Sequence, residues 1–578
     1  MPTLLPNRTT VLVVGGGPVG LLTSVMLTRL GVDNIVVERR TAEQEAPAAH
    51  VVNARTFEIM RAAGVDMERV EAAGRPATDG WVRWVTNLTG EELGCVPFER
   101  QHQLADLDTV TPTPLRNLSQ NLLEPILGDH VTNAFRGVEW VEAVEVVDEH
   151  GAGLVSTLRD TGTGELHHVR SEYLVGADGA GSPVRRSVGI TMEGPQRLES
   201  IISIHVHADL RHLVAHRPAT LYWLIDPELN GNTFVAHDID STWVYMYRWN
   251  PDVDDIANYT VDRCEQLFRS ALGVEVGPVS VRSITPWNMS CQVADRYRDG
   301  RVFLAGDAAH RFPPTGGLGL NTGAVDAQNL AWKLAAVHHG WASPALLDSY
   351  EAERRPIAQT NAQQSLENAL KLFEVTMALG ADADPEVTRR NYAEVMASPE
   401  RRAAAAAACL RQTEHFDMLG LQLGFNYIAD GAAVVDDGTS LLTPDDVVRD
   451  YLPTTHPGAR LPHAWVWRGS ERVSTLDLVP LDRFVLLTSS PAWAAAGREL
   501  VGGPVPLVVV LIAGGAGDVD SDVRDLDGTW SAVAEIGSEG ALLVRPDQHV
   551  GWRALAGPPA ADGALAQLRE ALMTLVGR

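Results

Sequence analysis

Positive charge is scarce in this sequence. Its 47 lysine and arginine residues are outnumbered by 74 aspartate and glutamate residues, which gives a formal net charge of −27 at pH 7. Nucleic acids and anionic membrane surfaces bind basic faces, so this balance argues against both. We therefore expect neither nucleic acid nor membrane among the partners of this chain.

Cysteine is also scarce. The four cysteines stand far apart, at positions 95, 264, 291 and 409. Their spacing matches neither a metal-ligand pattern nor a disulfide framework. We therefore expect no metal site, and we expect the reducing cytoplasm as the compartment.

Long apolar runs are missing as well. The run at residues 505–513 is too short for a bilayer span, which takes about 20 apolar residues. The apolar stretch at residues 11–30 contains a glycine triplet and has no cleavage pattern, so we interpret it as part of the fold. At 578 residues, 45% of them hydrophobic, the chain can fill the cores of about two to four domains.

A glycine-rich motif stands between a predicted strand and a predicted helix near the N-terminus. Residues 10–14 form the continuous apolar run of a buried parallel strand, and residues 19–30 have helical apolar spacing. Between them, Gly15, Gly17 and Gly20 match the dinucleotide-binding fingerprint. In that fingerprint the first glycine permits a tight turn, the second lets the backbone approach a pyrophosphate, and the third allows close helix packing.

A carboxylate follows near the distance that the fingerprint requires. The second strand, at residues 35–37, ends at Glu38, which is suited to bind a ribose hydroxyl, and Arg39 is adjacent. A glycine-rich turn without a nucleotide is the alternative, but strand, helix and carboxylate together favour nucleotide binding. Taken alone, the motif leaves NAD and FAD open.

A second motif, far along the chain, favours FAD. Residues 302–305 form an apolar strand that ends at Gly306 and Asp307, and a loop rich in proline and glycine follows at residues 313–320. A helix is predicted over residues 321–337. Such a loop lets backbone lie against a flat ring, and an acidic side chain can accept hydrogen bonds from a polyol chain.

These motifs, with a third between them, carry a family resemblance. Residues 15–20, residues 176–185 and the pair Gly306 and Asp307 resemble, in order, the three motifs of the FAD-dependent aromatic hydroxylases. These are single-component flavoprotein monooxygenases of the p-hydroxybenzoate and phenol hydroxylase group. The ordered triple is far more specific than any one of its members.

Three further segments extend the resemblance over most of the chain. Residues 52–58 are similar to the helix start after the second strand, and residues 118–124 to the helix on the flavin side. Residues 457–465 resemble the opening of the C-terminal thioredoxin-like domain of the family. The candidate cofactor-binding residues are therefore Gly15, Gly17, Pro18, Gly20, Glu38, Arg39, Arg55, Gln120, Asp178, Asp307, Pro314, Gly319, Leu320 and Asn321.

The resemblance implies a role for each part of this set. Asp307 would hold the ribityl chain of FAD, and the start of the predicted helix at Asn321 would face the pyrimidine edge of the flavin ring. Dipoles there stabilise the charge of reduced flavin. The segment containing Asp178 would lie between FAD and the NADPH or NADH that reduces it. We interpret the glycine-rich residues 513–517 as a loop, because no helix is predicted after them.

The predicted fold class is α/β, with an inserted domain. A Rossmann-type FAD-binding domain is expected at residues 1–75, 108–185 and 280–345, interrupted by an antiparallel-sheet substrate domain at residues 76–107 and 186–279. A helical bridging region is expected at residues 346–451 and a thioredoxin-like domain at residues 452–578. The last segment contains no cysteine, which excludes dithiol chemistry and favours a packing role, such as a homodimer interface.

The implied activity is hydroxylation of a phenolic or polyketide-type aromatic substrate. NADPH or NADH would reduce the flavin, dioxygen would form a flavin C4a-hydroperoxide, and one oxygen atom would pass to the ring. The candidate catalytic residues are His237, Tyr222 and Tyr245 on the predicted sheet, and Pro314 beside the flavin ring. Strand alternation turns only about half of such sheet residues toward the flavin.

Several alternatives stay open. Baeyer–Villiger oxygenation and an oxygen-independent flavin reductase or dehydrogenase fit the same scaffold, and a non-catalytic nucleotide-binding protein could keep the motifs. A flavin-dependent halogenase is disfavoured, because Trp81 and Trp84 have the wrong spacing for its tryptophan motif and no lysine precedes Lys333.

Overall fold

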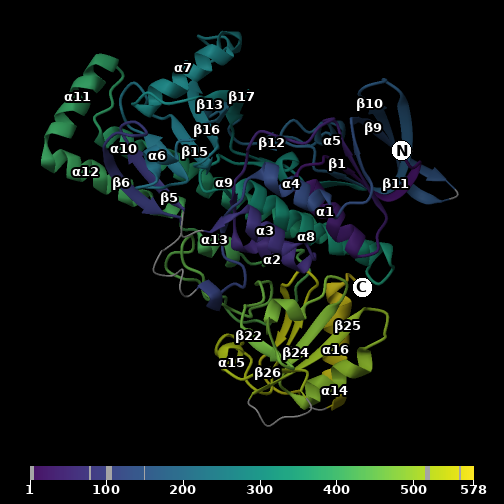
Figure 1. Ribbon diagram of the computed structural model, residues 1–578. Coiled ribbons are helices and arrows are strands. Elements are labelled where there is room, and N and C mark those ends of the chain that lie inside the picture. Colours follow the sequence, from purple (N-terminus) through teal and green to yellow (C-terminus); the bar gives the residue numbers. More distant parts are fainter. Residues whose placement is uncertain (1–4, 77–79, 99–106, 149, 515–520, 559–560) are drawn as a thin grey trace.

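The computed structural model describes residues 5–578 except 77–79, 99–106, 149, 515–520 and 559–560 (Figure 1). The N-terminal apolar runs form the centre of its first sheet. β1 (Arg8–Val14) pairs in parallel with β2 (Asn34–Glu38) on one side and with β11 (Leu166–Gly176) on the other. Both runs are almost wholly buried, which explains their continuous apolar sequences. The other strands of this sheet are β8 (Ala134–Arg136), β9 (Val138–Asp148), β10 (Gly151–Asp160), β19 (Arg298–Asp299) and β20 (Val302–Leu304).

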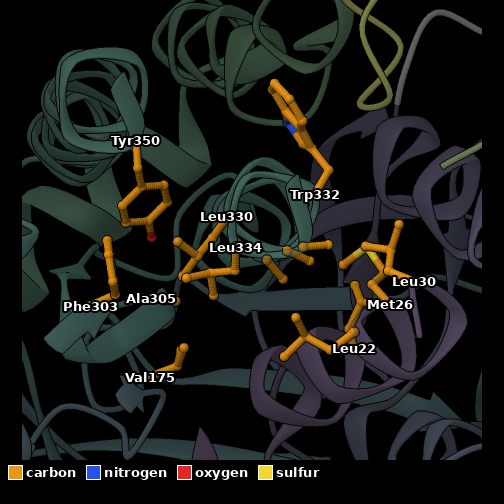
Figure 2. Close-up of a cluster of buried hydrophobic side chains, with 14 of the residues drawn as sticks. Leu22, Met26, Leu30, Val175, Phe303, Ala305, Leu330, Trp332, Leu334 and Tyr350 are labelled. Carbon is orange, nitrogen blue, oxygen red and sulfur yellow. The ribbon is translucent and has the colours of Figure 1, made fainter. Parts of the chain in front are cut away.

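Two helices from distant parts of the chain pack on each other beside this sheet. They are α1 (Pro18–Arg29) and α8 (Leu318–His338), and Figure 2 shows Leu22, Met26, Leu330 and Leu334 in one buried cluster. The surrounding helices are α2 (Ala54–Ala62), α3 (Met67–Ala73), α4 (Gln120–Gly128) and α5 (Pro183–Ser187).

The helix predicted from residue 321 begins earlier, at Leu318. Gly317 precedes it with a left-handed φ of +64°, a conformation that turns the chain directly into the helix. Gly319, Leu320 and Asn321 therefore lie in the first turn of α8 rather than in the loop before it.

The second sheet is built from the predicted antiparallel strands and lies on the far side of the molecule from the C-terminal sheet (Figure 1). All neighbours in it are antiparallel except β14 and β5, which pair in parallel. α6 (Arg211–Val214) and α7 (Val261–Leu272) belong to this part. In order, the strands are β17 (Ser280–Met289), β13 (Glu199–His207), β16 (Thr242–Trp249), β15 (Thr233–Asp238), β14 (Leu221–Leu224), β5 (Trp81–Val85) and β6 (Glu92–Pro97).

One expected boundary is wrong. Residues 280–289 were assigned to the FAD-binding part, but they form β17, which pairs with β13 along its whole length. The hydrogen bonds of that ladder place the strand in the second sheet. The remainder of the expected domain division stays a prediction.

Helices and short ladders connect these two sheets. Two ladders of short strands join distant segments: β3 (Val51–Val52), β7 (Arg116–Asn117) and β4 (Arg75–Pro76), and β12 (Met192–Glu193), β18 (Gln292–Ala294) and β21 (His310–Arg311). The helices that follow α8 are α9 (Ser349–Lys371), α10 (Phe373–Ala378), α11 (Pro385–Ala397), α12 (Pro399–Leu410) and α13 (Leu419–Leu423).

The C-terminal sheet packs below α2, α3 and α8 in Figure 1. Its centre is a parallel pair, β24 and β25, with β27 and then β28 added antiparallel beside β24, which agrees with the expected thioredoxin-like fold. Its helices are α14 (Pro491–Leu500), α15 (Thr529–Val533) and α16 (Ala561–Leu575). Its strands, in order, are β23 (Glu471–Ser474), β22 (Trp465–Arg468), β26 (Val523–Asp525), β25 (Leu507–Gly514), β24 (Phe484–Thr488), β27 (Ala541–Val544) and β28 (Val550–Ala554).

The α/β fold class is confirmed. Of the predicted loop at 513–517, residues 513 and 514 are the last residues of β25, and residues 515–517 lie outside the described part. Across the described parts of the chain, no helix has both the length and the apolar character of a membrane span. Within those same parts, His, Cys, Asp and Glu side chains form no group of three or more suited to a metal ion.

Candidate active site

The three fingerprint glycines occupy the turn between β1 and α1 for different reasons. Gly15 has a φ of +113°, and a Cβ there would lie 2.2 Å from the carbonyl oxygen of Ala177. A Cβ on Gly20 would lie 2.0 Å from the Gly15 carbonyl oxygen, so both positions need glycine for packing. At Gly17, no described atom lies within 4 Å of the Cβ position. This open space at the start of α1, where Pro18 opens the helix, fits a pyrophosphate.

A cleft of about 300 Å³ adjoins this turn, the end of β2 and the segment after β11. Glu38 accepts hydrogen bonds from the backbone N–H groups of Gly16 and Arg40, both at 2.8 Å. Burial acts to raise the pKa of Glu38, but the hydrogen bonds from Arg40 and Gly16 outweigh it and lower the pKa. The carboxylate is therefore ionised and suited to accept from ribose hydroxyls. Five predicted residues line the cleft: Gly15, Gly17, Glu38, Arg39 and Asp178.

The segment after β11 ties this cleft to the second motif. Asp178 accepts a hydrogen bond from the backbone N–H of Val184 at 3.0 Å, and Ser182 accepts one from that of Arg185 at 2.9 Å. The Arg185 guanidinium donates to the carbonyl oxygen of Ala308 at 2.9 Å. Burial raises the pKa of Asp178, against hydrogen bonds from Ser182 and Val184.

A buried acid holds the turn of the second motif. The backbone N–H of Gly306 donates to Asp326 Oδ2 at 3.1 Å, and His310 Nε2 lies 2.8 Å from the same atom. Arg354 Nε donates to Asp326 Oδ1 at 2.8 Å. The turn leaves the side chain of Asp307 exposed, while the protein packed around it raises its pKa. Sequence reasoning missed Asp326, whose only signal is an acid within the predicted helix at residues 321–337.

Asn321 acts as a clamp between the loop and α2. Its side-chain oxygen accepts from the backbone N–H of Asn53 at 3.0 Å and from the hydroxyl of Thr56 at 2.8 Å. Its side-chain nitrogen donates to the carbonyl oxygens of Val51 and Gly317. These contacts use both ends of the amide, so the Asn321 side chain positions the loop.

The loop and the first turn of α8 expose the remaining predicted residues. Pro314 is exposed, and Gly319 and Leu320 are partly exposed. No side chain caps the first turn of α8, so its N–H groups and its positive dipole end are open to a ligand. This arrangement fits the electron-rich edge of a flavin.

The expected cofactor contact of Arg55 is wrong. Its guanidinium is fully buried and donates to Glu58 at 3.0 Å and to Gln328 and Gln548 at 2.8 Å. It also donates to the carbonyl oxygen of Asp547. On α2, this position faces the C-terminal sheet rather than the cleft, so Arg55 joins two parts of the protein.

Gln120 is connected to Glu38 through Glu124 and Arg40. Its side-chain nitrogen donates to Glu124 at 2.7 Å, and Glu124 forms an ion pair with Arg40 at 3.7 Å. Arg40 in turn binds Glu38. The partly exposed Gln120 thus belongs to the polar cluster around Glu38 and Arg40, which line the cleft.

Tyr222 and Tyr245 do not lie in an accessible site. Both are buried in the core between the second sheet and α7, where Tyr245 lies 6.3 Å, centroid to centroid, from Phe268. The Tyr222 hydroxyl donates to the carbonyl oxygen of Arg217, and that of Tyr245 accepts from Asn232. Strand register places both on the face opposite to Trp223 and His205, so we withdraw them as catalytic candidates.

The opposite face of this sheet carries buried polar atoms that no described group satisfies. By register, Trp223 and His205 share this face, and His237, at the bulge between Ala236 and Asp238, lies near His205. Trp223 Nε1, His237 Nδ1 and both ring nitrogens of His205 have no hydrogen-bond partner among the described residues. Burying such groups without partners is unfavourable, which makes this face a candidate for ligand binding. We call these three residues the polar sheet face.

A third histidine, His50, was missed by sequence reasoning and lies against His237. The rings of His50 and His237 lie 5.2 Å apart in an edge-to-face arrangement, and His50 Nδ1 lies 2.9 Å from Asn117 Oδ1. Burial lowers the pKa of His50 to about 4, and burial, with His50 and His205 nearby, lowers that of His237 well below its usual value. Both rings are therefore neutral at pH 7. A single histidine in a loop has no motif that could have identified it.

Comparison with known proteins agrees with this geometry. A family described as FAD binding domain matches residues 8–365, and one described as aromatic-ring hydroxylase, C-terminal, matches residues 454–578. The chain is similar to 2,4-dichlorophenol 6-monooxygenase of Delftia acidovorans, with 36% identity over 98% of this chain and 97% of that protein. It is 35% identical to a putative polyketide hydroxylase of Streptomyces halstedii, over 99% of this chain and 97% of that protein.

Solved structures show the same likeness. The flavin-dependent monooxygenase PieE, in complex with FAD and substrate, is 34% identical with a TM-score of 0.90, covering 99% of this chain and 100% of that one. Aklavinone-11 hydroxylase, in complex with FAD and aklavinone, is 31% identical with a TM-score of 0.78, covering 99% of each chain. The motifs, the cleft and these matches together show that this chain belongs to the FAD-dependent aromatic-ring hydroxylases, a family of flavoprotein monooxygenases.

Proposed function

We propose that this chain uses NADPH or NADH to hydroxylate an uncharged phenolic or polyketide-type aromatic substrate. The observation that carries the proposal is the polar sheet face with His50 beside it. His50 directly precedes Val51. The Cβ of Val51 lies 2.8 Å from where a Cβ on Gly317 would be, in the loop before α8 (residues 312–317), which we call the flavin loop. An aromatic ring bound between this loop and the sheet face would satisfy polar groups that now lack partners.

The hydrogen bond between His50 and Asn117 sets where a proton can go. The amide oxygen of Asn117 only accepts, so Nδ1 of the neutral His50 ring carries the hydrogen and Nε2 carries the lone pair. His50 Nε2 is then suited to accept a hydrogen bond from a substrate hydroxyl, with His237 as its neighbour. Drawing the proton of that hydroxyl toward Nε2 raises the electron density of the ring and favours attack by an electrophilic oxygen.

The proposed cofactor residues bind and orient. Glu38 and the start of α1 would hold the adenosine and pyrophosphate, and Asp307 the ribityl chain. FAD, when bound, supplies the redox chemistry by accepting a hydride from NADPH or NADH and activating dioxygen. Exposed Pro314 and the first turn of α8 would line the ring and exclude water from it.

The substrate class rests on two supports. One relative is named for a dichlorophenol and another for a polyketide. In addition, His50 and His237 are held neutral, which favours an uncharged hydroxyl over a carboxylate. We therefore propose a phenol without an acidic substituent at this face.

The test uses FAD-loaded protein with phenol, 2,4-dichlorophenol, 1-naphthol and anthraquinone-type phenols. We expect slow NADPH or NADH oxidation alone, about 10-fold to 100-fold stimulation by the right phenol, and one atom from labelled dioxygen in the product. Fast oxidation that no aromatic alters, with no label incorporated, would identify a flavin reductase instead. Label inserted between a carbonyl and its neighbouring carbon would identify Baeyer–Villiger oxygenation.

A further inference from the structure

A small, largely enclosed recess lies behind the flavin loop. Gly316 of that loop and Leu318 at the start of α8 form one wall, and Phe98, His415, Phe416 and Met418 lie around the rest. Its volume of about 10 Å³ has room for about one water-sized group. The recess can therefore hold a single polar atom, and it cannot hold an aromatic ring.

His415 lines this recess together with Asn53, Asn321 and Gln422. The side chain of His415 is 2% exposed, and neither ring nitrogen has a hydrogen-bond partner among the described residues. Burial, reinforced by the positive charge of Lys371, lowers the pKa of His415 to about 3, so the ring is neutral. A neutral imidazole offers one donor and one acceptor, and both suit an uncharged oxygen.

The recess adjoins the proposed substrate site. Val51 lines it and directly follows His50, and Leu115 lines it and precedes by two positions Asn117, the partner of His50. A substrate whose reacting hydroxyl meets His50 would thus lie within reach of the recess mouth. His415 is the last residue of η6 (Arg411–His415).

We propose that His415 binds a second, unreacting hydroxyl or carbonyl oxygen of the aromatic substrate. The inference rests on the proposed aromatic hydroxylation and narrows its substrate class to aromatics with at least two oxygen substituents. His415 is thereby a specificity-determining residue that selects among phenols by the position of the second oxygen. A permanently bound water is the alternative occupant.

The test is calorimetric titration of the FAD-loaded protein with 1-naphthol and with the dihydroxynaphthalene isomers that have one of their two hydroxyls at position 1. We expect one isomer to bind about 10-fold more tightly than 1-naphthol, the worth of one good hydrogen bond to a buried group. His415→Leu should abolish that preference and leave the affinity for 1-naphthol unchanged. His415→Gln or His415→Asn should restore part of the isomer preference. The variant that does so indicates whether Nε2 or Nδ1 of the His415 ring binds the second oxygen.

Several results would overturn the inference. Wild-type protein that shows no isomer preference would do so, as would a preference that survives in His415→Leu. An equal loss of affinity for all ligands, with a lowered unfolding temperature, would assign the recess to a structural water. Because binding is measured without NADPH or NADH, a preserved preference without oxygenation would refute the proposed function and leave this inference standing.

Discussion

Two buried polar regions differ in how their groups are paired: one lies against the C-terminal sheet and the other on the second sheet. Between α2, α8, α9 and the C-terminal sheet, each charged side chain has an opposite charge in contact. Lys333 donates to Glu353 at 2.7 Å, Arg545 to the same carboxylate, and Arg460 to Glu58 at 2.8 Å. We call this the ionic network: Arg55, Glu58, Lys333, Glu353, Arg460, Arg545 and Asp547.

The polar sheet face is the reverse case. Trp223, His205 and His237 bury polar atoms that have no partner in the described structure. A buried polar group that is paired has its hydrogen-bonding capacity used within the protein. A buried polar group without a partner lowers the stability of the fold unless a ligand supplies that partner. The ionic network is therefore structural, and the polar sheet face is suited to ligand binding.

Removing one charge from the ionic network should have the largest effect. Glu353→Leu leaves Lys333 and Arg545 buried without their shared partner, so we expect a loss of about 3–5 kcal/mol in the free energy of unfolding. Urea denaturation measures it. Glu386→Ala breaks an exposed pair with Arg389 and should change nothing measurable. Equal stability of the two variants would contradict the distinction between the regions.

Acid should affect the two regions in sequence. Burial lowers the pKa of His50 and His205 to about 4, so the stability they contribute is complete above the unfolded value near 6.5 and is lost as pH falls toward 4. The pKa of Glu58 and Glu353 is lowered to about 2 by their arginine and lysine partners against burial, so their contribution is lost below about 4.5.

Denaturation curves from pH 7 to pH 3 measure this order. His50→Phe should flatten the first stage and leave the second unchanged. A first stage that is identical in wild type and variant would show that His50 is not held neutral by the fold.

Changing a cofactor group should weaken FAD binding without unfolding the protein. Asp307→Ala removes a proposed acceptor of ribityl hydroxyls and should cost about 1.5–3 kcal/mol of affinity, about 10-fold to 100-fold in Kd. Titration of apoprotein with FAD, followed by flavin fluorescence, measures it. Asp262→Ala, exposed at the start of α7, is the matched control. Unchanged affinity in Asp307→Ala would remove that residue from the site.

The smallest expected effect concerns the partner of His50. Asn117→Asp places a carboxylate at 2.9 Å from Nδ1, which favours the charged ring, so the lower limb of the kcat/KM profile against pH should move to higher pH. Asn117→Leu removes the acceptor and should lower kcat by about 10-fold through loss of one hydrogen bond. A pH profile that neither variant alters would exclude His50 as the proton acceptor.

The glycine motifs were predictable because they report local backbone needs. Gly15 and Gly20 are required within a few residues of a strand and a helix, so their spacing alone indicates the turn. The start of α8 was missed by a few positions because the left-handed Gly317, and not the apolar pattern, begins the helix. The fold class followed from the same local periodicities, with β17 misassigned at a boundary that only strand pairing decides.

Side-chain roles that depend on distant partners were not predictable. Arg55 fits the family pattern, yet its helix face meets Gln548 from far along the chain. Tyr222 and His205 are both polar residues of the second sheet, and only the ladder register assigns them to opposite faces. His50 belongs to no motif and gains its role from Asn117 and His237.

The sequence by itself determined the nucleotide turn, the acidic ends of two strands, the α/β class and the family, because each depends on residues close together in the chain. Only the tertiary structure decided which polar groups are paired, because pairing depends on register and on contacts between distant segments. Glu353 and His415 are both buried polar side chains in the helical part of the chain. One is surrounded by cations and the other faces a recess with room for one atom, and no local pattern distinguishes them.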